Sequence, residues 1–226
     1  MAQQQVQSAV GVGDPAPEFT LPGLDPARQV TLSAYRGRSN VLLGLFRGLH
    51  CPFCRRQVAL LNGIAPRLND EGIKVVAVIN TEPARMRGYY RSQTVRIDIG
   101  ADPDWRTHAR YGLGRLQATE GPTDWPRGLV NMDEFMALKV DPTGELDAPM
   151  SPVEANWALN KKDGFELDAV DQRIFDQHGM TGAGHFLIDR VGVVRWAWRE
   201  GEAGMATMAT FPTRQQILDA VLGASR

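Results

Sequence analysis

Cysteine is the scarcest informative residue in this chain of 226 residues, which contains only 2. Both lie in one tetrapeptide, Cys51-Pro52-Phe53-Cys54. A disulfide between them would close too short a loop to restrict the unfolded chain substantially. This excludes a disulfide-stapled framework and indicates that the pair serves chemistry. Because further cysteines are absent, we expect a reducing compartment and assign the protein to the cytoplasm.

An excess of one charge and long apolar runs are also missing. The 25 Lys and Arg residues nearly balance the 26 Asp and Glu residues, for a formal net charge of -1. We therefore expect neither nucleic acid nor a membrane surface as a partner. The longest apolar runs, 41–46 and 75–79, are far shorter than the ~18 residues of a membrane span. The N-terminus has no basic stretch before an apolar core, so we expect no secretory signal.

The apolar pattern that remains predicts alternating strands and helices. Hydrophobic residues make up 43% of the chain, enough for a full core. The segment 41–46 is apolar on both faces, as in a central strand covered by helices. Helical spacing follows over 58–68, and 73–79 forms the next buried strand. A β-α-β order favours parallel pairing of the two strands.

Weaker patterns flank this unit. They predict a hairpin near 19–32, a helix capped by Thr81, an alternating strand over 95–99, a helix over 102–112, a closing hairpin over 185–196 and a helix capped at Thr213. Between them, about 113–180 is rich in proline, with helices near 153–160 and 169–177. We interpret this stretch as an insertion that forms either a lid or a dimer contact. The expected organisation is a flexible arm over 1–12 and a single domain over 13–226.

The cysteine pair lies where the central strand feeds the following helix. Unpaired N–H groups and the helix dipole stabilise a thiolate at such an N-terminus. Arg47, Arg55 and Arg56 add positive charge nearby. Cys54 lies one turn further along, within reach of an adduct formed at Cys51. We therefore predict Cys51 as the nucleophile and Cys54 as the resolving thiol.

These motifs resemble the peroxiredoxin (AhpC/TSA) and TlpA-like branch of the thioredoxin superfamily. The resemblance rests on residues 13–21 (GDPAPEFTL), 30–33 with 36–37, 46–54, 102–103 with 111–112, and 186–192. It covers about 13–112 and 183–222, and the C-P-F-C motif is also similar to that of glutaredoxins. The resemblance implies a thioredoxin-like α/β fold, in which helices flank a central mixed β-sheet and an inserted segment precedes the last hairpin.

Three positions depart from the peroxiredoxin pattern. Gly44 and Gly48 stand where that pattern has Pro and Thr, and Ala183 stands where it has an active-site Arg or the TlpA-like branch a cis-proline. The missing donors weaken peroxide activation. We therefore expect a thiol-disulfide oxidoreductase, with a peroxidase acting on hydrogen peroxide or organic hydroperoxides as the alternative. A thioredoxin- or glutathione-type reductant would restore the dithiol, and we expect no cofactor.

Two histidines complete the set of candidate site residues, Cys51, Cys54, His185, His50 and Arg47. By the resemblance, His185 would face the cysteine pair and pair with the thiolate or move its proton, unless it is only a strand-end residue bonded to backbone. His50 would tune or merely cover the thiol. A zinc site formed by both cysteines and both histidines is the rival hypothesis. A non-enzymatic binding module that uses the insertion as its contact surface is another, and a homodimer remains open.

Overall fold

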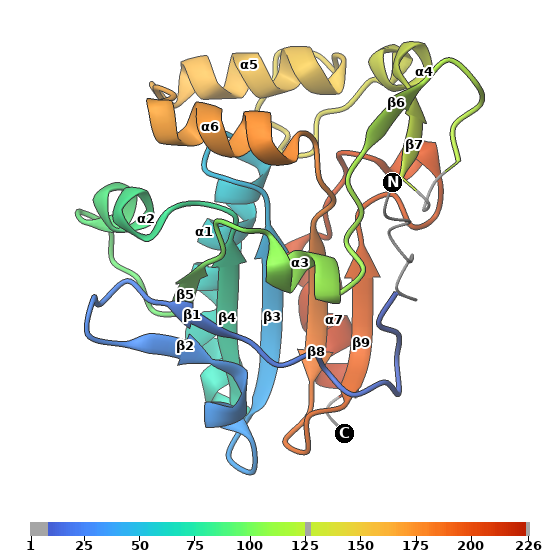
Figure 1. Ribbon diagram of the computed structural model, residues 1–226. Helices are drawn as coiled ribbons and strands as arrows, with labels where there is room; N and C mark the ends of the chain where they lie inside the picture. Colours follow the sequence, from blue (N-terminus) through green and yellow to red (C-terminus); the bar gives the residue numbers. More distant parts are fainter. Residues whose placement is uncertain (1–8, 125–127, 225–226) are drawn as a thin grey trace, which may run out of the picture.

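The structure is a computed structural model that describes residues 9–124 and 128–224. A five-stranded sheet in the order β5-β4-β3-β8-β9 forms its centre (Figure 1). The strands are β3 (Asn40–Phe46), β4 (Ile73–Ile79), β5 (Asp98–Ala101), β8 (Gly184–Ile188) and β9 (Val194–Arg199). β3 is parallel to β4 and antiparallel to β8, so the sheet is mixed, as predicted.

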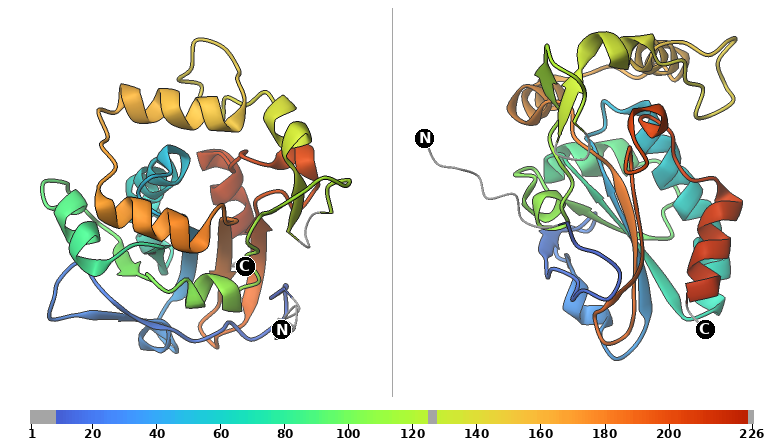
Figure 2. Two further views of the ribbon diagram at one scale, coloured as in Figure 1. Left: turned by 45° about the horizontal axis from the view of Figure 1, so that its top comes forward. Right: turned by 90° about the vertical axis from the view of Figure 1, so that its right-hand side faces the viewer.

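Helices α1 (Pro52–Asp70) and α7 (Arg214–Ala224) cover one face of the sheet (Figure 2). Side chains alternate along β3: Leu42 and Phe46 face these helices, whereas Leu43 and Leu45 face the other way. The second face is covered by the hairpin β1 (Thr20–Pro22) and β2 (Gln29–Thr31), and by α3 (Arg106–Arg110). Both faces of β3 are therefore buried, which explains its continuous apolar sequence.

The inserted segment (residues 113–180) lies above the carboxyl end of β3 (Figure 1). Its elements are β6 (Gln117–Thr119), β7 (Leu129–Asn131), α4 (Met132–Ala137), α5 (Pro152–Lys162) and α6 (Ala169–His178). The helices predicted near 153–160 and 169–177 are present as α5 and α6. The short parallel pair β6–β7 and α4 were not predicted.

Ion pairs and hydrogen bonds connect the inserted segment to the sheet and its helices. The Arg55 guanidinium on α1 donates to Asp163 at 2.5 Å and to Asn160 Oδ1 at 2.9 Å. On α2 (Pro83–Tyr90), the Arg85 guanidinium contacts the buried carboxylate of Asp171 at 2.5 Å. Because these contacts join α1 to α5 and α2 to α6, the inserted segment is held in a defined position above α1.

Two local predictions were wrong and one was confirmed. Thr81 does not cap α2: Glu82 occupies the cap position, and the Thr81 hydroxyl is buried with no partner among the described residues. The strand predicted from Val95 begins only at Asp98. At α7, the Thr213 hydroxyl accepts from the backbone N–H of Gln216, whose side chain accepts from the Thr213 N–H, which is the predicted capping box.

The division into an arm and one domain stays a prediction. Residues 1–8 of the predicted arm lie outside the described residues, whereas Val10 is buried in the core beneath the second face. Within the described ranges, no helix has the length and apolar character needed to cross a membrane.

Candidate active site

Cys51 occupies the N-cap position of α1, directly after the loop that leaves β3. Its backbone is extended, and its Sγ accepts a hydrogen bond from the backbone N–H of Cys54 at 3.3 Å. Pro52 takes the first helical position, where a missing N–H costs no hydrogen bond. The strand, loop and proline together aim one thiol at the unpaired N–H groups of the helix, as predicted from the sequence.

The two thiols are free and in direct contact. Their Sγ atoms lie 2.8 Å apart, and both side chains are only 2% exposed. Burial raises the pKa of Cys51, but the Cys54 hydrogen bond, the Arg47 charge and the helix N–H together lower that pKa to about 6. Burial and the neighbouring Cys51 raise the pKa of Cys54 well above its usual value. Near neutral pH, Cys51 is therefore the thiolate and Cys54 the proton donor to it.

Arg47 brings the positive charge to this thiolate. Its Nε donates to Cys51 Sγ at 3.4 Å, and its Nη1 donates to the Thr181 carbonyl at 2.8 Å. The same guanidinium donates two hydrogen bonds, of 2.6 and 3.1 Å, to the Glu200 carboxylate. Burial alone would lower the pKa of Arg47, but Glu200 and the two thiols raise it well above the usual value. The guanidinium is therefore held in its charged form despite its burial.

Glu200 is a site residue that the sequence did not reveal. It follows β9 and is 2% exposed, and its carboxylate also accepts from the backbone N–H groups of Ala183 and Ala209. A carboxylate with this many donors is held in one position, and it fixes the Arg47 guanidinium in turn. In the sequence, Glu200 lies between Arg199 and Gly201 at the end of an ordinary strand, where no pattern distinguishes it from a solvent-exposed residue.

The departures from the peroxiredoxin pattern are built into the loop geometry. A Cβ atom at Gly48 would lie 2.8 Å from the Asn80 carbonyl oxygen and 2.8 Å from the His50 ring. A Cβ at Gly44 would lie 2.5 Å from the Phe46 ring. Ala183 is fully buried, with its N–H on Glu200. Arg47, the residue after β3, reaches the same loop through the Thr181 carbonyl.

His50 lies beside the thiol but bears no charge at neutral pH. Burial, with the charges of Arg47 and Arg55, lowers the pKa of His50 to about 4. Its ring packs edge-on against Phe175 of α6, with a centroid distance of 5.4 Å, and its buried Nδ1 has no partner among the described residues. The neutral imidazole lines the same cavity as Cys51 and packs against the inserted segment; whether it tunes or covers the thiol stays a prediction.

His185 lies in the core. It pairs with Gly44 across β3 and β8 and is 0% exposed. Its ring packs against Phe46 at 5.4 Å and Trp198 at 5.5 Å between centroids, and neither nitrogen has a partner in the described part of the chain. Burial lowers its pKa to about 3. Within the described residues, no hydrogen bond or charge interaction joins His185 to Cys51, so the predicted pairing with the thiolate is not seen, and the backbone-bonded alternative is absent as well.

The rival zinc site is not assembled either. Across residues 9–124 and 128–224, no three His, Cys, Asp or Glu side chains gather in a geometry that could hold a metal ion. Cys51 and Cys54 are close, but His185 sits in the aromatic core instead of joining them.

A cavity of about 340 Å³ opens directly onto Cys51. Its floor comes from Arg47, His50, Cys51, Phe53 and Glu200, and its walls come mainly from the inserted segment, including Phe135, Val153, Trp157 and Phe175. The view from above in Figure 2 shows the start of α1 between α5 and α6. The predicted insertion thus forms a roof over the thiol; whether it also makes a dimer contact stays a prediction.

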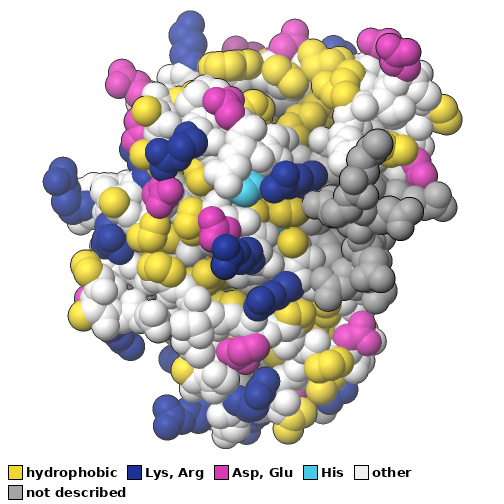
Figure 3. All heavy atoms as spheres, viewed as in Figure 1, with side chains coloured by type: hydrophobic (Ala, Val, Ile, Leu, Met, Phe, Trp, Pro, Cys, Tyr) yellow, Lys and Arg dark blue, Asp and Glu magenta, His cyan; other side chains and the backbone are white. Residues whose placement is uncertain are grey.

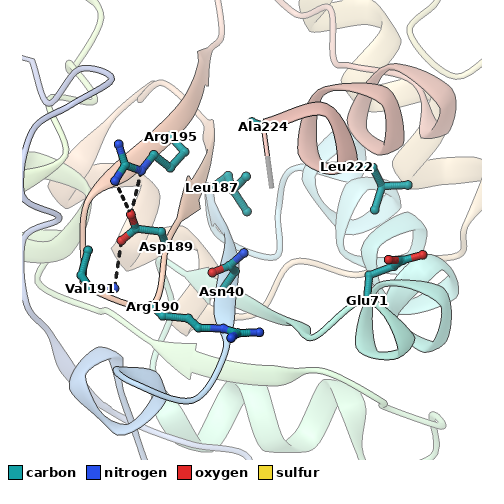
Figure 4. Close-up of a pocket in the computed structure, with 9 residues that line it drawn as sticks. All are labelled: Asn40, Glu71, Leu187, Asp189, Arg190, Val191, Arg195, Leu222 and Ala224. Carbon is teal, nitrogen blue, oxygen red and sulfur yellow. Dashed lines mark hydrogen bonds and ion pairs between the residues drawn. The ribbon is translucent and has the colours of Figure 1, made fainter. Parts of the chain in front are cut away.

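A second and larger hollow, of about 580 Å³, lies near the opposite end of the sheet (Figure 4). It is bordered by Asn40, Glu71, Asp189 and Arg195, and the Asp189 carboxylate is already bound to Arg195 at 2.6 Å. Neither cysteine lies near it, because β3 separates its Asn40 end from Cys51 along the whole strand. The site of chemistry is therefore the smaller cavity.

Comparison with known proteins agrees with this geometry. The sequence model of the AhpC/TSA family matches residues 12–197. The chain belongs to the AhpC/TSA family. A thiol-disulfide oxidoreductase, ResA of Geobacillus thermodenitrificans, is 31% identical over 114 residues, which are 50% of this chain and 64% of ResA. The chain thus spans less than two thirds of that relative's length.

Solved structures confirm the predicted thioredoxin-like fold for this AhpC/TSA chain. A peroxiredoxin-like protein from Aquifex aeolicus superposes with a TM-score of 0.55 at 14% identity, covering 97% of this chain and 90% of that protein. The reduced 2-Cys peroxiredoxin of Plasmodium vivax gives a TM-score of 0.55 at 11% identity, covering 93% and 79%. At these identities the likeness concerns the fold alone.

Proposed function

We propose that this protein is a dithiol–disulfide oxidoreductase in which Cys51 attacks a disulfide and Cys54 resolves the adduct. The observation that supports it most directly is the contact of 2.8 Å between two free thiols whose pKa values are driven in opposite directions. A thiolate is the attacking species in disulfide exchange, and a low pKa keeps Cys51 in that form near neutral pH.

The reaction has two exchange steps. Cys51 thiolate forms a bond to one sulfur of the substrate disulfide, and the other sulfur leaves as a thiolate that takes up a proton. Cys54 then loses its proton and attacks Cys51 Sγ, which forms the Cys51–Cys54 disulfide and expels the second substrate thiol. Two electrons pass from the protein to the substrate. Arg47 lies next to Cys51 Sγ, where it stabilises negative charge before each step.

Hydrogen-bond capacity favours disulfide over peroxide as the oxidant. The Arg47 guanidinium has five N–H donors, and four hydrogen bonds are already directed at Cys51, Thr181 and Glu200. One donor is left for a peroxide oxygen. Gly48 cannot be replaced by a hydroxyl-bearing residue without displacing the Asn80 carbonyl or the His50 ring. Peroxide would therefore find little polarisation of its O–O bond, although a peroxidase remains the alternative.

The remaining partners follow from the same chemistry. A thioredoxin- or glutathione-type thiol system would return the Cys51–Cys54 disulfide to the dithiol, and a cytoplasmic setting would keep it reduced. His50 and His185 take no proton-transfer role in this proposal: both are neutral at physiological pH, and in the described part of the chain neither ring is hydrogen-bonded to Cys51.

Trapping of the mixed disulfide tests the proposal. Reduced Cys54→Ser protein, mixed with a small disulfide, should retain one substrate half on Cys51 by mass spectrometry. The parent protein should release both halves, and Cys51→Ser should retain none. In parallel, stopped-flow mixing with hydrogen peroxide should oxidise the reduced parent only slowly. Fast oxidation by peroxide that Cys51→Ser abolishes, without trapping in Cys54→Ser, would establish the peroxidase instead.

A further inference from the structure

The cavity over Cys51 has a mostly apolar wall. Carbon-rich side chains from both the sheet region and the inserted segment face it, among them Phe53, Leu116, Phe135, Val153, Met180 and Met208. Three more apolar residues of the lining stay partly in solvent: Trp157 is 64% exposed, Phe175 41% and Leu167 37%. We call these three the apolar rim. Figure 3 shows apolar side chains gathered at the top of the molecule, where α5 and α6 lie in Figure 1.

The cavity offers no charge that is free to bind an ion. The charged lining residues are Arg47, Glu200 and the Cys51 thiolate, and Arg47 contacts Glu200 at 2.6 Å and Cys51 Sγ at 3.4 Å. The other polar members of the lining are neutral at physiological pH, namely His50, Asn156 and Gln172. A charged substrate group would lose its hydration here and find only charges that Arg47 already pairs, which is unfavourable. The wall therefore discriminates against ammonium and carboxylate groups.

The position of the thiol also limits the size of what reaches it. Cys51 is 2% exposed, and α5 and α6 lie on either side of the start of α1 (Figure 2). These helices are held by partly buried ion pairs, Arg55 with Asp163 and Arg85 with Asp171. A disulfide on the surface of another folded protein would have to enter between α5 and α6 to reach Cys51, whereas a small disulfide needs only the cavity. The volume of about 340 Å³ is near the lower end, about 300 Å³, of small-molecule sites.

We propose that this cavity binds small, uncharged, apolar organic disulfides and delivers them to Cys51. The inference rests on the dithiol–disulfide function proposed above and names its substrate class. For a disulfide R–S–S–R, Cys51 bonds to one sulfur and one R–S⁻ leaves; Cys54 then bonds to Cys51 and the second R–S⁻ leaves. Each R–S⁻ ends as R–SH, and the dithiol becomes the Cys51–Cys54 disulfide, so one disulfide is reduced as another forms.

Three disulfides of equal size separate polarity from reactivity. Dipropyl disulfide, bis(2-hydroxyethyl) disulfide and cystamine carry a methyl, a hydroxyl or an ammonium group at each end of the same chain. The rate of oxidation of the reduced protein by each is divided by its rate with dithiothreitol, which corrects for the leaving thiol. We expect the corrected rate to be highest for dipropyl disulfide and at least about tenfold lower for cystamine. Equal corrected rates, or a preference for cystamine, overturn the proposal.

Substitutions in the wall test the cavity itself. Val153→Trp fills space above the thiol and should abolish the preference for dipropyl disulfide. Lys161→Trp places the same side chain on the exposed part of α5 and should leave the preference unchanged. Trp157→Ala removes a mostly exposed side chain that the fold does not need, so it serves if Val153→Trp does not fold. It should weaken the preference by removing part of the apolar rim. A preference that survives both cavity variants counts against the proposal.

A binding measurement separates failure of this inference from failure of the function. The double variant Cys51→Ser, Cys54→Ser cannot exchange, but its cavity wall is intact. It should bind the neutral fluorescent probe N-phenyl-1-naphthylamine, and dipropyl sulfide, which has no S–S bond, should displace the probe. If the double variant binds the probe but the parent protein does not exchange disulfides, the cavity is an apolar site, but the proposed function and the proposed substrate class are both wrong. Exchange in the parent without probe binding or polarity preference would retain the function and sink this inference.

Discussion

The sheet with α1 and α7, here called the scaffold, and the inserted segment are held together by different interactions. The scaffold has two extensive apolar cores, one on each face of β3. The inserted segment contributes Val140, Ala155 and Leu159 to one of these cores and has a smaller cluster of its own, in which Val130 and Phe135 pack against Met208. Arginine ion pairs attach it further to α1 and α2. Burial of apolar area is insensitive to salt, whereas ion pairs weaken with salt and with loss of one partner. The chemistry thus rests on the more robust region and substrate access on the more adjustable one.

Matched truncations of two phenylalanines test this contrast most strongly. Phe186 is fully buried against Tyr111 in the scaffold, and Phe186→Ala should reduce the free energy of unfolding by about 3–5 kcal/mol. Phe135→Ala should reduce it by less, because its cluster is small. Urea titration measures the difference, and hydrogen exchange should show the Phe135 variant opening mainly within 113–180. Equal global destabilisation with no local opening would mean that the two regions unfold as one.

Acid sensitivity should reside in the scaffold. Burial lowers the pKa of His185 from 6.5 to about 3. Between these two pH values the imidazole is protonated in the unfolded chain but not in the folded protein. The stabilisation is complete above pH 6.5 and is lost as the pH falls towards 3, by about 1.4 kcal/mol per pH unit. His185→Leu should flatten this loss in denaturant titrations between pH 6.5 and 4. At pH 8 the variant should be at least as stable as the parent, and unchanged steepness in acid would refute the assignment.

A matched pair of arginines tests where the thiol is tuned. Arg47→Met removes the charge and the hydrogen bond beside Cys51, and should raise the Cys51 pKa from about 6 by about 1–3 units. Arg173→Met makes the same change on α6, at an exposed pair with Glu82, and should not move it. The pH dependence of iodoacetamide alkylation, followed by peptide mass spectrometry, reports the pKa. A shift in the Arg173 variant would show that the inserted segment also tunes the thiol.

The smallest expected effects concern the attachment of the inserted segment. Asp163 accepts from both Arg55 and Arg56, and Asp163→Asn should destabilise the protein by about 1–3 kcal/mol. Glu82→Gln breaks only the exposed pair with Arg173 and should cost about 0.2–1 kcal/mol. Thermal unfolding at low and high salt measures both, and the Asp163 effect should shrink at high salt. If the two variants were equal, attachment by buried ion pairs would be the wrong description.

The features predicted from sequence are those that depend on local pattern. A doubly buried strand must be continuously apolar, so β4 was found with its bounds, Ile73–Ile79. The cysteine pair at the start of a helix was likewise visible, because capping and dipole effects act within one turn. Glu200 and the packing of His185 were not visible, since each depends on which side chains β8, β9 and α1 bring together. Apolar periodicity is also weak in the inserted segment, because ion pairs contribute part of the stabilisation that apolar packing provides elsewhere.

The buried row of charges formed by Cys51, Arg47 and Glu200 determines how many protons are taken up when the Cys51–Cys54 disulfide is reduced. In the reduced protein this buried row carries one net negative charge, and in the disulfide form it carries none. Above about pH 6, reduction by two electrons therefore takes up one proton, and below it two. The midpoint potential of the Cys51–Cys54 couple should fall by about 30 mV per pH unit above that point and by about 59 mV below it. The pH of the compartment therefore sets the reducing strength of the dithiol, and the dependence of the midpoint potential on pH changes slope at about pH 6.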